Sequence, residues 1–248
     1  MMLKVPYLNP KTIERDAIAL LAEYARARDI VLVPPIPIED IVEKHLKLGI
    51  DFDDTHSLFG VPRVGDKPDI LGAMFFKEGR IVIDESLDPE EHPRMEGRYR
   101  FTLAHEGGGH WRLHRSYFES DSGEVDRFEG VSPKSFICRS SDVRVPVEWQ
   151  ADFYASCLLM PRDLVFAAWN EMFPDQMPRV FPQSQPVDHP FVEVPVVKFN
   201  IAGLKYADTA ESAFENFAVP LARRFIVSPI AMRIRLEKLG LLLRRVPA

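Results

Sequence analysis

Three parts of the chain carry apolar residues three or four positions apart, a spacing that predicts amphipathic helices. They are residues 10–27, 38–48 and 146–160. Pro10 and Pro146 stand in the first turns of two of these helices, where a missing backbone N–H does little harm. Gly49 and Pro161 follow the last residues of two of the patterns and end them.

A different pattern predicts a β-hairpin. Two apolar runs, 70–76 and 81–83, enclose the polar turn 77–80, in which Gly79 supplies the conformational freedom that a tight turn needs. The polar residues 116–145 show no periodicity that assigns an element. Helical spacing also occurs, with interruptions, over residues 98–114, 209–217 and 219–243.

Prolines punctuate a later stretch that has neither a helical nor a strand period. They are Pro174, Pro178, Pro182, Pro186, Pro190 and Pro195. Such a composition is typical of a linker or of an arm that wraps over a surface. We therefore expect a first domain at 1–172, a linker or arm at 173–198 and a C-terminal helical module at 199–248. The expected fold class is α+β, mostly helical with a small β-sheet.

Composition narrows the class of protein. Of 248 residues, 46% are hydrophobic and 27% are charged, which excludes a disordered chain. A net charge of −6 argues against a protein that binds nucleic acid over its whole surface. Two cysteines are too few for a fold held together by disulfides. The sequence lacks both a bilayer-spanning apolar run and an apolar signal core. We expect a cytoplasmic protein that does not contact membranes.

The hexapeptide HEGGGH at 105–110 carries the candidate chemistry. Two histidines beside a glutamate on one helix are typical of zinc hydrolases, in which the imidazoles bind the ion and the carboxylate acts as a base. The usual spacing of four places the two imidazoles about 40° apart on an α-helix. The spacing of five found here would place them about 140° apart, too far to share one ion.

The three glycines between the histidines suggest how the extra residue is absorbed. Each lowers helix stability by roughly 1 kcal/mol relative to alanine, so a purely structural helix has little reason to carry three. A one-residue π-bulge would realign His105 and His110, and glycine also permits close approach of another backbone. The alternative is a broken helix with two solvent-facing histidines. A phosphate-binding loop fits less well, because no Lys-Ser/Thr pair follows.

The predicted helix at 146–160 offers a third ligand. Glu148 and Asp152 are four positions apart and face the same way. One carboxylate can bind the metal while the other accepts the free N–H of a ligand histidine and fixes its tautomer. Ala151 and Ala155 are small, so this helix can lie close to the glycine-rich one.

The two motifs resemble those of the ImmA/IrrE family of metallopeptidases. The segment RFTLAHE at 100–106, followed by GHW at 109–111, is similar to the start of the family's active-site helix. The segment EWQADFYA at 148–155, followed by LLMP at 158–161, is similar to its second motif. The preceding hairpin is similar to the family's strand pair, and the resemblance covers roughly residues 35–165.

The resemblance implies a zincin-like fold and a zinc-dependent endopeptidase that cleaves a helix-turn-helix repressor or antitoxin-like protein. It implies that His105, His110 and Glu148 hold the zinc, that Glu106 activates a zinc-bound water, and that Asp152 is the partner of a ligand histidine. Peptide hydrolysis also needs a donor for the developing oxyanion. The candidates are His114, Tyr117 and Tyr154.

The histidine spacing departs from the family pattern H-E-x-x-H by one residue. Dipeptidyl peptidase III enzymes carry H-E-x-x-x-H, bind zinc and cleave peptides, so a spacing of five is compatible with catalysis in a different family. A second arrangement stays open, in which His110 and His114 form the metal pair and Glu106 lies one turn before them. A third hypothesis is that the extra glycine has inactivated the metal site.

The C-terminal segment is basic. From residue 221 onward it holds seven basic residues and one acid, a local charge of +6. It resembles a helix-turn-helix, with the turn at Val227-Ser228 and Pro229 opening the second helix. Such helices can contact DNA phosphates, or dock on the peptidase domain or on a repressor. The rival to the peptidase is therefore a non-catalytic regulator that binds a repressor or DNA through these helices.

Overall fold

The computed structural model describes residues 5–61, 70–120, 135–139, 146–181 and 210–244. This part of the chain is mostly helical with a small sheet, so the predicted α+β class is confirmed. Its α-helices are α1 (Pro10–Arg28), α2 (Ile38–Asp40), α3 (Thr55–Phe59), α4 (Glu96–Ala104), α5 (Arg115–Ser120), α6 (Pro146–Leu159), α7 (Arg162–Met172), α8 (Ala210–Phe225) and α9 (Pro229–Lys238).

The remaining elements are strands, π-helical segments and 3-10 turns. The strands are β1 (Gly49–Asp53), β2 (Ile70–Phe75), β3 (Arg80–Asp84), β4 (Ser135–Arg139), β5 (Arg179–Phe181) and β6 (Leu242–Arg244). The π-helical segments are η1 (Ile41–His45) and η4 (His105–His114), and the 3-10 turns are η2 (Glu85–Leu87) and η3 (Pro93–Met95).

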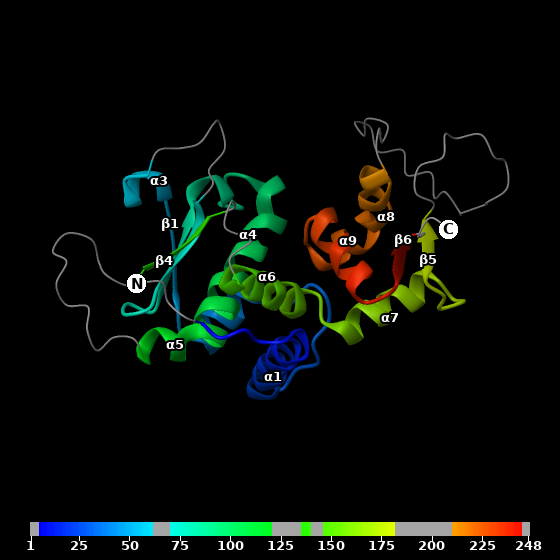
Figure 1. Ribbon diagram of the computed structural model, residues 1–248, viewed down its shortest axis with the longest axis horizontal. Coiled ribbons are helices and arrows are strands. Elements are labelled where there is room, and N and C mark those ends of the chain that lie inside the picture. Colours follow the sequence, from blue (N-terminus) through cyan, green and yellow to red (C-terminus); the bar gives the residue numbers. More distant parts are fainter. Residues whose placement is uncertain (1–4, 62–69, 121–134, 140–145, 182–209, 245–248) are drawn as a thin grey trace.

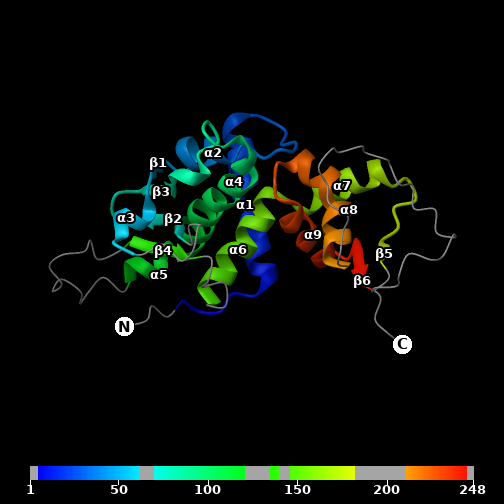
Figure 2. The same cartoon turned by 90° about the horizontal axis from the view of Figure 1, so that it is seen from above.

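The four-stranded sheet and the C-terminal helices lie at opposite ends of the molecule (Figure 1). Helices α1, α4 and α6 occupy the region between them (Figure 2). Helix α6 packs against both η4 and α1, which brings the two sequence motifs side by side. In the part of the chain that the structure describes, every helix is too short or too polar to cross a membrane.

The first predicted helix begins as its sequence indicates. Asn9 precedes α1, and its side chain accepts a hydrogen bond of 3.0 Å from the backbone N–H of Thr12. This bond satisfies one of the donors that a first helical turn leaves unpaired. The predicted helix at 38–48 is shorter than expected, because α2 and η1 end at His45. Helix α6 ends at Leu159, close to the predicted boundary.

The sheet contains the predicted hairpin and two strands that were not predicted. Strands β2 and β3 pair antiparallel, with Phe75 opposite Arg80. Strand β1 begins at Gly49, which was predicted only to end a helix, and it pairs in parallel with β3. It is mostly exposed and five residues long, so its hydrophobic pattern gives no signal. Strand β4 pairs with β2 and lies in the polar region that had no prediction.

The C-terminal region differs from the prediction in two ways. Helix α8 continues through Pro220, because a proline removes only one backbone hydrogen bond and packing can compensate for it. Residues 242–244 form β6, which pairs in parallel with β5, whereas a helix to residue 243 and no strand in the proline-rich stretch were predicted. The predicted turn is confirmed, since the Ser228 side chain caps α9 at the N–H of Ala231. Residues 182–198 of the predicted linker and residues 199–209 of the predicted C-terminal module lie outside the described residues.

One hydrophobic cluster runs from α1 to the C-terminal helices. Arg235 of α9 lies where the C-terminal helices meet the rest of this cluster, and 1% of its surface is exposed. Its guanidinium donates to the backbone oxygen of Met160 at 3.0 Å and to Glu14 of α1 at 2.7 Å. The C-terminal helices therefore share the core of the rest of the chain. The predicted domain limits stay a prediction.

Several basic side chains of the C-terminal segment pair with acids of the same chain. Arg224 pairs with Glu171 of α7. Arg233 and Arg244 both pair with Glu237, each at 3.0 Å. Much of the positive charge of this segment is thus neutralised by ion pairs within the chain. Contact with DNA stays a prediction.

Candidate metal centre

The HEGGGH segment continues α4 as a π-helix. In η4 the backbone hydrogen bonds span five residues instead of four, so residues i and i+5 come to the same side. The two ring atoms His105 Nε2 and His110 Nε2 consequently lie 3.0 Å apart. The predicted π-bulge is confirmed, and it extends over ten residues instead of one.

The glycines of η4 let α6 approach its backbone. A Cβ atom on Gly109 would lie 2.5 Å from the Cβ of Ala151. A Cβ atom on Gly108 would lie 2.7 Å from the ring of Tyr154. Both distances are shorter than any ordinary contact between carbon atoms. The predicted close packing of the two motif helices is therefore confirmed, and it depends on the missing side chains.

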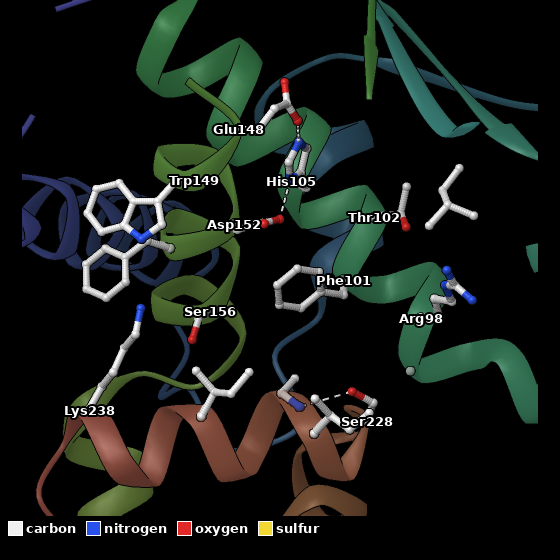
Figure 3. Close-up of a pocket in the computed structure, with 16 residues that line it drawn as sticks. Arg98, Phe101, Thr102, His105, Glu148, Trp149, Asp152, Ser156, Ser228 and Lys238 are labelled. Atoms are coloured by element: carbon white, nitrogen blue, oxygen red, sulfur yellow. Dashed lines mark hydrogen bonds and ion pairs between the residues drawn. The ribbon is translucent and has the colours of Figure 1, made fainter. Parts of the chain in front are cut away.

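Helix α6 carries Glu148 to the two imidazoles, and Figure 3 shows its carboxylate beside the ring of His105. Its Oε2 lies 3.1 Å from His105 Nε2, and its Oε1 lies 3.6 Å from His110 Nε2. The three side chains are buried, and one ligand atom from each lies within 4.8 Å of the others. Among the residues that the structure describes, this group has the composition and spacing of a metal site.

Asp152 orients the first imidazole. Its Oδ1 lies 2.9 Å from His105 Nδ1, so the carboxylate accepts the proton of that nitrogen. A neutral His105 then presents the lone pair of Nε2 to the cluster. Asp152 thus lies next to His105, one of the two candidate ligand histidines, while Glu148 faces both candidate ligand rings.

A second hydrogen-bonded chain orients the other imidazole. Gln150 donates from Nε2 to the backbone oxygen of Pro6 at 3.1 Å, so its Oε1 faces His114 Nε2 at 3.4 Å as an acceptor. His114 Nδ1 is then left to accept from His110 Nδ1, also at 3.4 Å. Burial lowers the pKa of His114 to about 3, which keeps this ring neutral. His110 therefore also presents the lone pair of Nε2 to the cluster.

The donor set fits a cation. Two imidazole lone pairs and a carboxylate converge, and among the described residues neither oxygen of Glu148 has an aligned hydrogen bond. Without an ion, only protons shared among these atoms can relieve their repulsion. Burial alone would raise the pKa of Glu148, but hydrogen bonds and positive charge from His105 and His110 in their protonated form outweigh burial and hold that pKa well below its usual range. A cation bound to the three atoms would replace those protons.

Glu106 follows the first histidine but lies apart from the ligand atoms. Its side chain is fully buried, and neither carboxyl oxygen has a hydrogen-bond partner among the described residues. Burial raises the pKa of Glu106 to about 8; His105 opposes this rise, whereas the negative charges of Glu148 and Asp152 add to it. Such a carboxyl group exchanges a proton near neutral pH.

The three candidates for oxyanion stabilisation differ in their surroundings. Both ring nitrogens of His114 are engaged in the chain that orients His110, which also removes it from the ligand set. The hydroxyl of Tyr154 donates to Asp16 of α1 at 2.8 Å, and its ring packs on the η4 backbone. Tyr117 lies in α5, beyond the π-helix, and is half-buried. His114 and Tyr154 therefore act through positioning and packing in this structure.

A cavity of about 750 Å³ opens beside the cluster. His105, Glu148 and Asp152 line it, whereas Glu106 does not. Its walls come from α4, α6 and α9, so the C-terminal helices border the candidate site (Figure 3). A ligand of small-molecule or peptide size could thus reach the metal ligands.

Sequence reasoning missed two contributors to the site. Gln150 completes the chain that orients His110, and Asp16 holds Tyr154 against η4. The signal for Gln150 was weak, since it is one amide in a helix rich in apolar and small residues. Asp16 lies more than 130 residues from its partner, so nothing local could reveal it.

Comparisons with known proteins leave the family open. No protein-family model matches the chain, and a search of curated proteins finds no significant similarity.

Proposed function

We propose that this protein is a zinc-dependent endopeptidase. The observation that carries the proposal is the convergence of the buried side chains of His105, His110 and Glu148, of which His105 and Glu148 also line a cavity. Two imidazoles and one carboxylate form the donor set of many catalytic zinc sites, which leave a further position open. The resemblance of both motifs to ImmA/IrrE metallopeptidases supports the same reading and a zincin-like fold.

In this proposal, a bound zinc and different residues of the chain would each carry out one part of the hydrolysis. A bound zinc supplies a Lewis acid that polarises a carbonyl group and acidifies water. Glu106 takes a proton from the attacking water and passes it to the leaving amine, a task suited to its raised pKa. Because Glu106 is buried and does not line the cavity, this role requires its side chain to rotate when metal or substrate binds. Asp152 keeps His105 in its ligand orientation.

The proposed substrate is a helix-turn-helix repressor or an antitoxin-like protein, as the family resemblance implies. The test has two parts. Elemental mass spectrometry of the purified chain should find about one zinc per chain, and the Glu148→Gln variant should lose it while staying folded by circular dichroism. Incubation with a repressor encoded beside the gene should yield fragments, and Glu106→Gln should abolish them while the metal is retained.

A second function follows from one observation. The burial of Glu106 away from the cavity favours a non-catalytic regulator, which would hold a metal and bind a repressor without cleaving it. That reading predicts zinc in the purified protein, a stable complex with the repressor and no fragments from either the parent chain or Glu106→Gln. Metal-dependent cleavage that disappears in Glu106→Gln would exclude it.

A further inference from the structure

One wall of the cavity comes from α9. Ile230, Ile234 and Lys238 line it at intervals of four residues, so they share one face of that helix. Ile230 is 49% exposed and Ile234 is 38% exposed, whereas Met232 and Leu236 on the other face are buried in the core. Helix α9 therefore presents an uncovered apolar stripe to the cavity that contains the metal ligands.

The opposite walls are aromatic. Phe101 of α4 and Trp149 and Phe153 of α6 face the same space, and the rings of Trp149 and Phe153 stack 5.7 Å apart (Figure 3). These side chains and the α9 stripe make the lining predominantly apolar. A volume of about 750 Å³ accommodates several side chains of a bound peptide. The space is continuous with His105 and Glu148, so an occupant would lie beside the proposed zinc.

Two cations mark opposite ends of this apolar space (Figure 3). Arg98 belongs to α4, and Lys238 lies at the end of α9 with its ammonium group 4.6 Å from the ring centre of Phe153. Within the described ranges, neither cation lies within 4.0 Å of a carboxylate. The acids that line the cavity, Glu148 and Asp152, are both engaged with the histidine cluster. The two ends are therefore positive and available to a ligand.

We propose that this cavity binds a protein segment with large apolar side chains bordered by an acidic residue at each end, and that α9 selects it. Calling this segment the substrate rests on the proposed peptidase function, whereas the binding preference does not. The apolar side chains fill the space between α9 and the aromatic wall, which is the favourable part of binding. The acidic residues pair with Arg98 and Lys238 and decide between segments of equal hydrophobicity.

The first test compares two peptides on the full-length Glu106→Gln chain with zinc supplied. The peptides are acetyl-Glu-Ala-Leu-Phe-Leu-Ala-Glu-amide and its counterpart with lysine at both ends, and isothermal titration calorimetry measures their affinities. Two partly exposed ion pairs should favour the acidic peptide by about tenfold at low salt, and 0.5 M salt should reduce the difference. A third peptide with serines in place of the apolar core should not bind. Equal affinities of the two charged peptides, or no binding of either, would overturn the proposal.

Variants of the cavity sharpen this test. Lys238→Glu should remove most of the preference for the acidic peptide, and Ile234→Asp should weaken both apolar peptides at least tenfold. Matched controls are Arg15→Glu and Ile18→Asp on the exposed face of α1, outside the cavity lining, and they should change neither. If Ile234→Asp fails to fold, the exposed Lys238→Glu variant still decides, because an unchanged preference there contradicts the proposal.

The outcomes separate this inference from the proposed function. A preference for acidic ends together with no cleavage of any substrate would remove the peptidase and leave the binding site. Cleavage of a repressor without any preference between the charged peptides would remove the binding site and leave the peptidase.

Discussion

The described residues include two π-helical segments, η1 and η4, whose side chains differ in character. In η1 the positions i and i+5 are held by Ile41 and Leu46, whose backbone groups are hydrogen-bonded at 2.9 Å. In η4 the equivalent relation joins His105 and His110. The same backbone geometry therefore aligns an apolar pair in one segment and an imidazole pair in the other.

The two segments also differ in what surrounds them. Segment η1 buries only Ile41 and Val42 and leaves its charged side chains at or near the surface. Segment η4 buries all of its histidines and its glutamate. A Cβ on Gly107 would lie 2.8 Å from Val42, so the segments touch at this point. A wide helix alone does not make such a cluster: the glycines of η4 let α6 pack closely against it, and α6 adds Glu148 to the two histidines.

The largest expected effect on stability comes from adding a side chain where the glycines of η4 contact α6. Gly109→Ala places a methyl group within 2.6 Å of the Cα of Ala151, so the backbone must move. We expect a loss of about 3 kcal/mol in the free energy of unfolding and loss of the metal. Gly107→Ala meets the side chains of Val42 and Ile81 and should lower the free energy of unfolding by less. Urea denaturation and metal analysis measure both. Equal stability of the two variants would show that α6 does not depend on this contact.

The next effect concerns the chain that orients His110. Gln150→Leu replaces the amide by an apolar side chain and so removes the acceptor of His114. Because such partners of metal ligands typically contribute 10–100-fold to metal affinity, we expect zinc affinity to fall by roughly tenfold or more. Competition with a chromophoric chelator gives the value. An unchanged affinity in a folded variant would mean that His110 is held by packing alone.

A matched change in η1 should affect stability only. Ile41 is fully buried, and Ile41→Val removes one methylene group, which typically lowers the free energy of unfolding by about 1 kcal/mol. Zinc affinity should equal that of the parent chain. A parallel loss of zinc would show that η1 and η4 form one cooperative unit and would contradict a role of η1 in stability alone.

The smallest effect is a pH dependence beside η1. Asp40 accepts hydrogen bonds from Lys44 and from the hydroxyl of Tyr24, which hold its pKa below the usual range. A lowered folded-state pKa stabilises the fold above the unfolded-state pKa, and this contribution disappears as pH falls through the folded value. The stability of Asp40→Asn should therefore fall less steeply than that of the parent chain as the pH drops below about 5, and its metal content should not change. Thermal unfolding from pH 7 to pH 3 tests this, and an unaltered fall in stability would contradict it.

Elements with a clear period were predictable from the sequence. The spacing of apolar residues from Ile13 to Tyr24 identified α1, and the runs on either side of Gly79 identified the hairpin. Strand β1 and the pair β5–β6 were missed, because β1 is mostly exposed and strands of three to five residues are too short to show a period. Parallel pairing also joins segments far apart in the chain, and local patterns do not encode such partners.

The sequence by itself determined the chemistry available at the site. Its HEGGGH segment required a π-helical distortion before both histidines could face one ion, and the spacing of Glu148 and Asp152 placed both carboxylates on one helix face. Tertiary structure alone decided which carboxylate lies in the candidate metal site, since the packing of α6 on η4 sets Glu148 against both rings. It also engaged His114 with Gln150 and buried Glu106 away from the cavity. These outcomes depend on contacts between distant segments, which periodicity and spacing along one chain do not specify.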